Sequence, residues 1–140
     1  MEMINKLDNL STIMVSNVIK VRDTDSIEHI DSIFTENFVN HLPVINKEEK
    51  LVGVISKKDY LSYLRFVSEE TSGKTWTKLR AQSFKATEIM SHMPFCLLPD
   101  DTIEQAIEAF TDNNFHCIPI VDQMEIVGVV TPYDILKVIN

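Results

Sequence analysis

The sequence predicts a mixed α+β fold built from two copies of a β-α-β-β-α unit. The chain has 140 residues, of which 44% are hydrophobic and 24% charged, which is typical of a globular domain. Each half of the chain holds a stretch of similar sequence, and matching residues of the two stretches are separated by a nearly constant number of positions. This indicates an internal repeat. Within each stretch the apolar residues pass from strand-like to helix-like spacing in the same order, so both copies are expected to fold alike.

The repeat is visible in short matching segments. Ile13-Met14 recurs as Ile89-Met90 and Leu42-Pro43-Val44-Ile45 as Ile118-Pro119-Ile120-Val121, both at the same spacing. Leu51 to Ser56 recurs as Ile126 to Thr131, and Asp59 as Asp134, both at a spacing shorter by one position. The loop after Pro43 is therefore one residue longer than the loop after Pro119. A unit of about 55 residues is too short to bury a good core alone, so the two copies are expected to pack together.

Each copy is expected to begin with an extended segment and a helix. The extended segments lie at Val18 to Val21 and at Pro94 to Leu98. In the second copy the spacing of one buried helix face is shown by Ile103, Ala106, Ile107 and Phe110. Asp101 followed by Glu104 predicts a capping arrangement at the start of this helix. Asp25 and Glu28 predict the same arrangement in the first copy.

Two strands and a second helix complete each copy. The strands are expected at His41 to Ile45 with Leu51 to Ile55, and at Cys117 to Val121 with Ile126 to Val130. Each pair flanks a polar turn, as adjacent β-strands do. The closing helices are expected from Lys57 to about Val67 and from Pro132 to Ile139. A proline suits the first helical position because its missing N–H has no helical partner there.

The charge of the chain is unevenly spread. The sequence holds 13 Lys+Arg against 21 Asp+Glu, a net charge of -8, which argues against nucleic acid and anionic membranes as partners. Residues 1–85 hold 12 bases and 12 acids, whereas residues 86–140 hold one base, Lys137, and nine acids. This excess of acidic residues indicates either a solvated acidic face or two halves that differ in how they bind an anion.

Other features exclude several classes of protein. Gly53, Gly73 and Gly128 are too far apart for a Gly-rich phosphate loop. No apolar run is long enough to span a membrane, and the start of the chain does not read as a secretory signal. Cys96 and Cys117 are too few for a disulfide framework, and no His or Cys pair has the spacing of a zinc site. A soluble cytoplasmic protein without a metal is expected.

The segment from Ser68 to Lys85 has no counterpart in the second half. It is polar and carries four bases around Trp76, namely Lys74, Lys78, Arg80 and Lys85. It is either a solvated linker with one anchoring aromatic or a contact with a partner or ligand.

The two copies together resemble a tandem pair of CBS domains, the regulatory unit also called a Bateman module. The resemblance rests on two segments of the first copy, Leu42-Pro43-Val44-Ile45 and Val52-Gly53-Val54-Ile55-Ser56-Lys57-Lys58-Asp59, and on their counterparts, Ile118-Pro119-Ile120-Val121-Asp122 and Val127-Gly128-Val129-Val130-Thr131-Pro132-Tyr133-Asp134. It implies a first repeat at residues 9–67, a linker at 68–83 and a second repeat at 84–140. It also implies repeats packed about a pseudo-twofold axis, with clefts that bind adenine nucleotides, and a homodimer of such pairs.

The resemblance implies ligand sites where a strand becomes a helix, at Ser56-x-x-Asp59 and Thr131-x-x-Asp134. A helix N-terminus favours phosphate through its free N–H groups and positive dipole end. The family pattern assigns ribose binding to Asp59 and Asp134. A Ser or Thr followed three residues later by Asp is also a helix capping box, which needs no ligand. The spacing alone leaves both roles open, and the two can coexist.

The phosphate positions of the family differ in this chain. In the gamma subunit of the AMP-activated kinase, a similar module, His and Arg shortly before the strand proline reach the phosphates. The matching positions here are Asn40 with His41 and His116 with Cys117, and neither pair contains Arg. Tight binding of a multiply charged phosphate is therefore not implied.

Further candidates lie beside these positions. Lys57 and Lys58 could supply charge for a phosphate in the first repeat, whereas the second repeat has Pro132 and Tyr133 there. The two sites are therefore expected to be unequal. The complete set of ligand-binding candidates is Ser56, Lys57, Lys58, Asp59, Thr131, Tyr133, Asp134, His41, His116, Ile118 on the apolar strand, and Ser91 at a position that contacts the base.

These observations predict a regulatory module and not an enzyme, since the two repeats leave no room for a catalytic domain. An adenine nucleotide such as AMP, ADP or ATP is expected as a regulatory ligand, with no required cofactor. Its binding would favour one relative orientation of the repeats, which an effector protein reads. Two alternatives stay open: a receptor for cyclic di-AMP or S-adenosylmethionine, and a structural or adaptor dimer with empty clefts.

Overall fold

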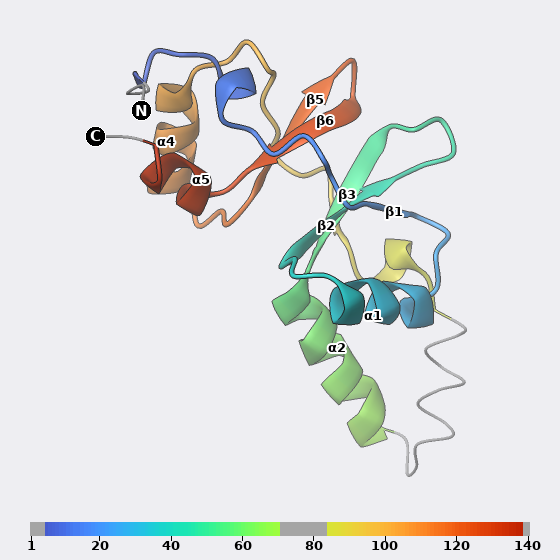
Figure 1. Cartoon of the computed structure of the whole chain (residues 1–140). Helices are drawn as coiled ribbons and strands as arrows, with labels where there is room; N and C mark the ends of the chain where they lie inside the picture. Colours follow the sequence, from blue (N-terminus) through green and yellow to red (C-terminus); the bar gives the residue numbers. More distant parts are fainter. Residues whose placement is uncertain (1–4, 71–83, 139–140) are drawn as a thin grey trace. The chain divides into compact units, whose positions relative to one another are not determined.

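The computed structural model describes residues 5–70 and 84–138 (Figure 1). Two compact units are formed. The first unit is Ile19–Met93, and the second unit combines Met1–Val18 with Pro94–Asn140. Trp76 and the neighbouring bases Lys74, Lys78 and Arg80 lie outside the described residues.

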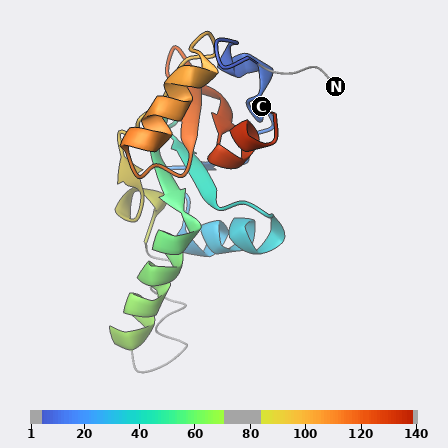
Figure 2. The same cartoon turned by 90° about the vertical axis from the view of Figure 1, so that its left-hand side faces the viewer.

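The first unit is a four-stranded sheet with helices. The strands, in the order β1-β2-β3-β4, are Val21–Arg22, His41–Ile45, Leu51–Ser56 and Ser91–His92. β1 pairs with β2 in parallel, and the other two pairings are antiparallel. The helices are α1 (Ile27–Glu36), α2 (Lys57–Glu70) and the short η2 (Ala86–Glu88). Figure 2 shows α2 running on directly from the end of β3.

The second unit repeats this pattern with fewer regular strands. β5 (Ile118–Asp122) pairs with β6 (Glu125–Val130) in antiparallel register. Single bridges flank this pair, Leu97 to Ile120 in parallel and Val15 to Val129 in antiparallel. The helices are η1 (Leu10–Thr12), α4 (Ile103–Asp112) and α5 (Pro132–Leu136). Each bridge matches a pairing of the first unit at the offset of the repeat, so the predicted α+β fold of two repeated β-α-β-β-α units is confirmed.

The leading segment of each copy packs in the unit that holds the other copy's strands. The pair Ser91 and Val54 in the first unit corresponds to Val15 and Val129 in the second. Leu10 is completely buried in the second core and Met90 belongs to the first. Each compact unit therefore combines residues from both sequence repeats.

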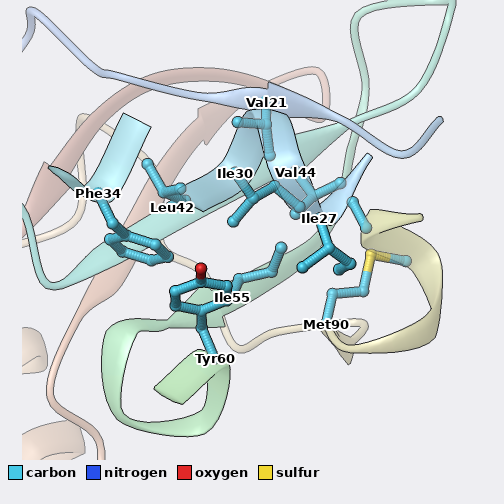
Figure 3. Packing of buried hydrophobic residues seen from close by; sticks show 10 residues of the cluster. Val21, Ile27, Ile30, Phe34, Leu42, Val44, Ile55, Tyr60 and Met90 are labelled. Atoms are coloured by element: carbon cyan, nitrogen blue, oxygen red, sulfur yellow. The ribbon is translucent and has the colours of Figure 1, made fainter. Parts of the chain in front are cut away.

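Each unit has its own buried hydrophobic cluster. In the first unit the buried residues are Val21, Ile27, Ile30, Phe34, Leu42, Val44, Ile55, Tyr60, Ala86 and Met90 (Figure 3). Figure 3 shows the stacked rings of Phe34 and Tyr60 at one end of the cluster and Met90 beside Ile27 at the other. In the second unit the buried residues are Leu10, Ile103, Ala106, Ala109, Ile118, Ile120, Val130 and Ile135. The predicted helix faces and strands supply most of both clusters.

The predicted helix caps are wrong by one residue. The N-cap of α4 is Thr102, whose hydroxyl accepts the Gln105 N–H at 3.2 Å, while the Gln105 side chain accepts the Thr102 N–H at 2.8 Å. The Asp101 carboxylate instead accepts the Leu98 N–H at 2.8 Å in the preceding turn. A carboxylate that closes a turn is not available to cap the next helix, so the hydroxyl one position later takes that role.

The first copy shows the same shift. Ser26 is the N-cap of α1 and accepts the His29 N–H at 3.1 Å. The Asp25 carboxylate accepts the Arg22 N–H at 2.8 Å. In both copies, therefore, an Asp closes the turn and the hydroxyl residue that follows it, Ser26 or Thr102, caps the helix.

The hairpin loops explain why the spacing between the repeats shortens by one position. In the second unit the loop is the pair Gln123 and Met124, at φ angles of 51° and 66°. Two positive φ values in a two-residue loop belong to a type I′ turn. In the first unit the Asn46 side chain accepts the N–H groups of Glu48 and Lys50, both at 3.0 Å, which holds a longer turn.

The closing helices differ from their predicted lengths. α2 continues to Glu70, beyond the predicted end at Val67, since Ser-Glu-Glu contains no helix breaker. α5 ends at Leu136, before the predicted end at Ile139. Residue 139 lies outside the described residues, but Lys137 and Val138 already form a turn.

Candidate functional site

The first candidate site is the junction of β3 and α2. β3 ends at Ser56, and the Ser56 hydroxyl accepts the Asp59 N–H at 3.0 Å, so this serine caps the helix. The Lys57 N–H donates to the Asn40 carbonyl at 2.7 Å, which fixes the first turn against the chain before β2. The Asp59 side chain is exposed, and within residues 5–70 and 84–138 no group pairs with its carboxylate. This carboxylate is therefore available to a ligand.

Strand pairing places two more candidates beside this junction. His41, the first residue of β2, is directly opposite Ser56, and Ser91 on β4 is opposite Val54. Paired residues point to the same side of a sheet, as do residues two apart on one strand. His41, Ser56 and Ser91 thus share one face of the sheet.

On β3 this shared face is the less buried one. Along β3 the core residues alternate with partly exposed ones, and Val54 and Ser56 belong to the partly exposed set. Lys57 is partly exposed and Lys58 is exposed at the start of α2. The structure therefore gathers six candidates in the first unit, which are His41, Ser56, Lys57, Lys58, Asp59 and Ser91.

The second candidate site, the junction of β6 and α5, is already occupied by its own side chains. The Asp134 carboxylate accepts the Thr131 N–H at 2.9 Å and the Thr131 hydroxyl at 3.0 Å through one oxygen. The Thr131 hydroxyl in turn caps α5 in a complete capping box. Lys137 approaches the other carboxylate oxygen at 3.5 Å, and the Asp134 side chain is 7% exposed. Capping is therefore a structural role of Asp134.

The remaining candidates of the second unit lie around this capping box. Tyr133 is 69% exposed, and the Lys137 ammonium lies 5.2 Å from the centre of its ring. His116 is exposed, whereas Ile118 is completely buried in the core of the unit. Burial, and to a lesser degree the charge of Asp134, raises the pKa of the adjacent Cys117 thiol to about 12. A thiol with so high a pKa stays protonated at neutral pH, which makes it a poor nucleophile.

Lys137 is the residue that sequence reasoning did not include among the candidates. It is the single base of residues 86–140, which was the available signal. Its spacing of three residues from Asp134 allows the contact, but only the structure shows that the last turn brings the two side chains together.

Comparison with known proteins identifies the family. The family model of the CBS domain matches residues 10–65 and residues 86–140. The chain belongs to the CBS-domain family. It is thus a tandem CBS pair, and both strand-to-helix junctions fall inside the matched ranges.

Several solved structures share the fold of this CBS pair. The CBS domain of a CBS domain containing membrane protein from Sphaerobacter thermophilus has a TM-score of 0.79 at 21% identity, covering 96% of this chain and 90% of that chain. CBSX2 in complex with AMP has a TM-score of 0.76 at 23% identity, covering 93% and 94%. The CBS pair of protein MJ0100 in complex with 5′-methylthioadenosine and S-adenosyl-L-methionine has a TM-score of 0.74 at 23% identity, covering 92% and 93%.

Relatives by sequence include much longer proteins. A homoserine O-acetyltransferase of Methanohalobium evestigatum is 24% identical over 94% of this chain, which spans only 24% of that enzyme. A similar match to the homoserine O-acetyltransferase of Methanococcus vannielii spans 25% of the enzyme. The uncharacterized protein MJ1426 of Methanocaldococcus jannaschii is 27% identical, and the match covers 91% of this chain and 89% of that protein.

The described part of the chain offers neither a metal cluster nor a membrane-spanning helix. Among the described residues, no three His, Cys, Asp or Glu side chains lie together as metal ligands. No helix within residues 5–70 and 84–138 is both long and apolar enough to cross a membrane.

Proposed function

We propose that this CBS pair is a regulatory module that binds an adenosine compound, such as AMP, and itself catalyses no reaction. The observation that carries the proposal is the exposed Asp59 carboxylate beside the capped start of α2. It is supported by the fold neighbours described above, which bind AMP, 5′-methylthioadenosine and S-adenosyl-L-methionine.

The first junction offers a group for each part of such a ligand. The Asp59 carboxylate can accept both hydroxyls of a ribose diol, as an acidic residue does in dinucleotide folds. The start of α2, with Lys57 and Lys58, favours a phosphate. His41 and Ser91 lie on the same face of the sheet and offer further polar contacts. In the second repeat Thr131, Tyr133 and Asp134 hold the places of Ser56, Lys58 and Asp59, and His116 and Ile118 hold those of Asn40 and Leu42.

The ligand would act by shifting a conformational equilibrium. A ligand shifts such an equilibrium only by its differential affinity for the two states. We propose that an effector protein reads the favoured state, and that the module works in the cytoplasm as a homodimer, as the family resemblance implies. Light scattering of the purified protein at several concentrations tests the dimer.

Thermal melting against a panel of ligands tests the binding proposal. The panel is AMP, ADP, ATP, 5′-methylthioadenosine, S-adenosylmethionine and cyclic di-AMP. A ligand at 100 times its dissociation constant stabilises the folded protein by about 2.7 kcal/mol, which is a rise in Tm of several degrees. We expect this rise with at least one compound that carries a free ribose diol.

The variant Asp59→Ala separates ligand binding from helix capping. It should abolish the ligand-induced rise while changing the apo stability by less than about 0.5 kcal/mol, because the carboxylate has no partner among the described residues. Asp100→Ala, a change at another exposed acid, is the matched control and should keep the full rise.

Other results would favour the alternatives. A rise with cyclic di-AMP that survives Asp59→Ala would indicate a ligand without a free ribose diol. No rise with any compound would favour an adaptor in which Ser56 and Thr131 only cap helices, a role that the complete Thr131–Asp134 capping box already shows in the second unit.

A further inference from the structure

The two repeats differ in what surrounds the ribose-position carboxylate. In the second unit both oxygens of Asp134 are engaged, one by the N–H and hydroxyl of Thr131 and the other by Lys137. In the first unit Asp59 occupies the equivalent position, is exposed, and has no such partner within the described residues.

One sequence difference accounts for the cation. The residue three positions after Asp134 is Lys137, and the residue three positions after Asp59 is Ser62, which is exposed. Residues three apart on a helix are neighbours, so a lysine here can reach the carboxylate, whereas a serine brings no charge to it. The Lys137 ammonium also lies over the ring of Tyr133, 5.2 Å from its centre, which holds it on this side of the turn.

We propose that Lys137 is a built-in competitor for the ribose diol at the second repeat, so that an adenosine ligand fills the first repeat before the second. A diol that binds Asp134 must displace the ammonium from the carboxylate, whereas a diol that binds Asp59 displaces only water. This proposal rests on the proposed function, because it concerns which repeat takes the ligand.

A competing lysine changes ligand affinity in the opposite direction from an ordinary lysine contact, and this difference can be tested. A lysine near an anionic ligand normally tightens binding by Coulomb attraction. A lysine that competes for the ribose carboxylate weakens binding instead, for charged and uncharged ligands alike. A partly exposed ion pair of this kind corresponds to a change of about three- to fivefold in affinity.

The main experiment transfers the lysine to the first repeat. Calorimetric titration with AMP and with uncharged 5′-methylthioadenosine compares the wild-type protein with Ser62→Lys. We expect affinity at the first site to fall about three- to fivefold for both compounds. Ser62→Gln is the matched control, since it has a long polar side chain without the charge, and it should bind as the wild type does.

The reverse experiment removes the lysine from the second repeat. In the Asp59→Ala background the remaining binding reports the second site. Adding Lys137→Ser should tighten it about three- to fivefold. Lys6→Ser is the control, because Lys6 pairs with Glu104 in the same unit and its loss removes the same charge. A melting curve of each variant confirms that it is folded.

Three outcomes would overturn the inference while leaving the proposed function intact. They are unchanged or tighter binding by Ser62→Lys, weaker binding by Lys137→Ser, and equal wild-type affinity at both sites. If Lys137→Ser weakened the binding of AMP but not of 5′-methylthioadenosine, Lys137 would be a phosphate contact instead. Failure of every compound to bind the wild type would overturn the proposed function itself.

Discussion

Replacing Gly53 by Ala should destabilise the protein more than the equivalent change at Gly128. A Cβ added at Gly53 would lie 2.4 Å from the Met90 sulfur, 2.8 Å from Met90 Cγ and 2.8 Å from the carbonyl oxygen of Ser91. At Gly128 it would lie 2.6 Å from the Met14 sulfur, 2.9 Å from its Cγ and 3.2 Å from its Cβ. The two sites are crowded to a similar degree, but by different kinds of atom.

The kind of atom decides the size of the effect. A methionine side chain has three rotatable bonds and can move aside at moderate cost. The Ser91 carbonyl belongs to β4, which pairs with β3 at Gly53 and Val54, so it cannot retreat without weakening that pairing. Overpacking costs about 1–3 kcal/mol. We expect the free energy of unfolding to fall by about 2–3 kcal/mol for Gly53→Ala and by about 1 kcal/mol or less for Gly128→Ala.

Urea unfolding of the two variants and the wild type measures this difference. Double variants then test its cause. In a Met14→Ala background, Gly128→Ala should lower the free energy of unfolding much less than it does in the wild type. In a Met90→Ala background, Gly53→Ala should still cost a large part of its original amount, because the Ser91 carbonyl remains. The reasoning is refuted if Gly53→Ala costs no more than Gly128→Ala, or if Gly53→Ala costs nothing in the Met90→Ala background.

Four further predictions concern single features of the fold. Thr102→Ala should lower the free energy of unfolding by about 1 kcal/mol through loss of the α4 cap, and a silent Thr102→Ala in urea unfolding would contradict the assignment of that cap. Changing Gln123-Met124 to Asn-Gly should raise stability by about 1 kcal/mol, because both positions have positive φ; a lower Tm would contradict the type I′ turn. Burial raises the pKa of Cys117 to about 12, so alkylation by iodoacetamide should stay slow up to about pH 9 in the folded protein, while stability falls as pH rises above the unfolded thiol pKa of about 8.5. Burial and a hydrogen bond to Asp31 raise the pKa of Tyr60, and Tyr60→Phe should cost about 1 kcal/mol in unfolding experiments; no change would show that this bond adds nothing net.

The sequence predicted the parts of the fold that follow from local spacing. The helix of Ile103 to Phe110 and the paired strands were predictable because burial of one face imposes a period on the chain. The caps were displaced by one residue, because Asp and the following hydroxyl residue are both good capping residues and only the structure shows which one closes the preceding turn. The Gln123-Met124 turn carried no local signal, since neither residue favours positive φ.

The packing of the leading segments could not be predicted from the repeat. Ile13-Met14 and Ile89-Met90 are similar enough to pack on either set of strands, so the repeat does not say which set each one joins. The structure places Met14 against Gly128 and Met90 against Gly53. The accessibility of the candidate site was equally hidden. The motif gives the same spacing for Asp59 and Asp134, and only side-chain geometry shows that one carboxylate is open and the other engaged.

The exchange of leading segments leaves the charge asymmetry of the sequence intact. The second unit carries two Lys+Arg and ten Asp+Glu, a net charge of -8, whereas the first unit carries eleven of each. An anionic ligand at the second junction would meet this negative field as well as the ion pair on Asp134. The field is screened beyond about 8 Å at physiological salt, but the ion pair is local and partly buried, so added salt weakens it less. Higher salt should therefore narrow the difference in affinity between the two sites for AMP and leave it nearly unchanged for an uncharged adenosine compound. This comparison separates the contribution of the field from that of Lys137.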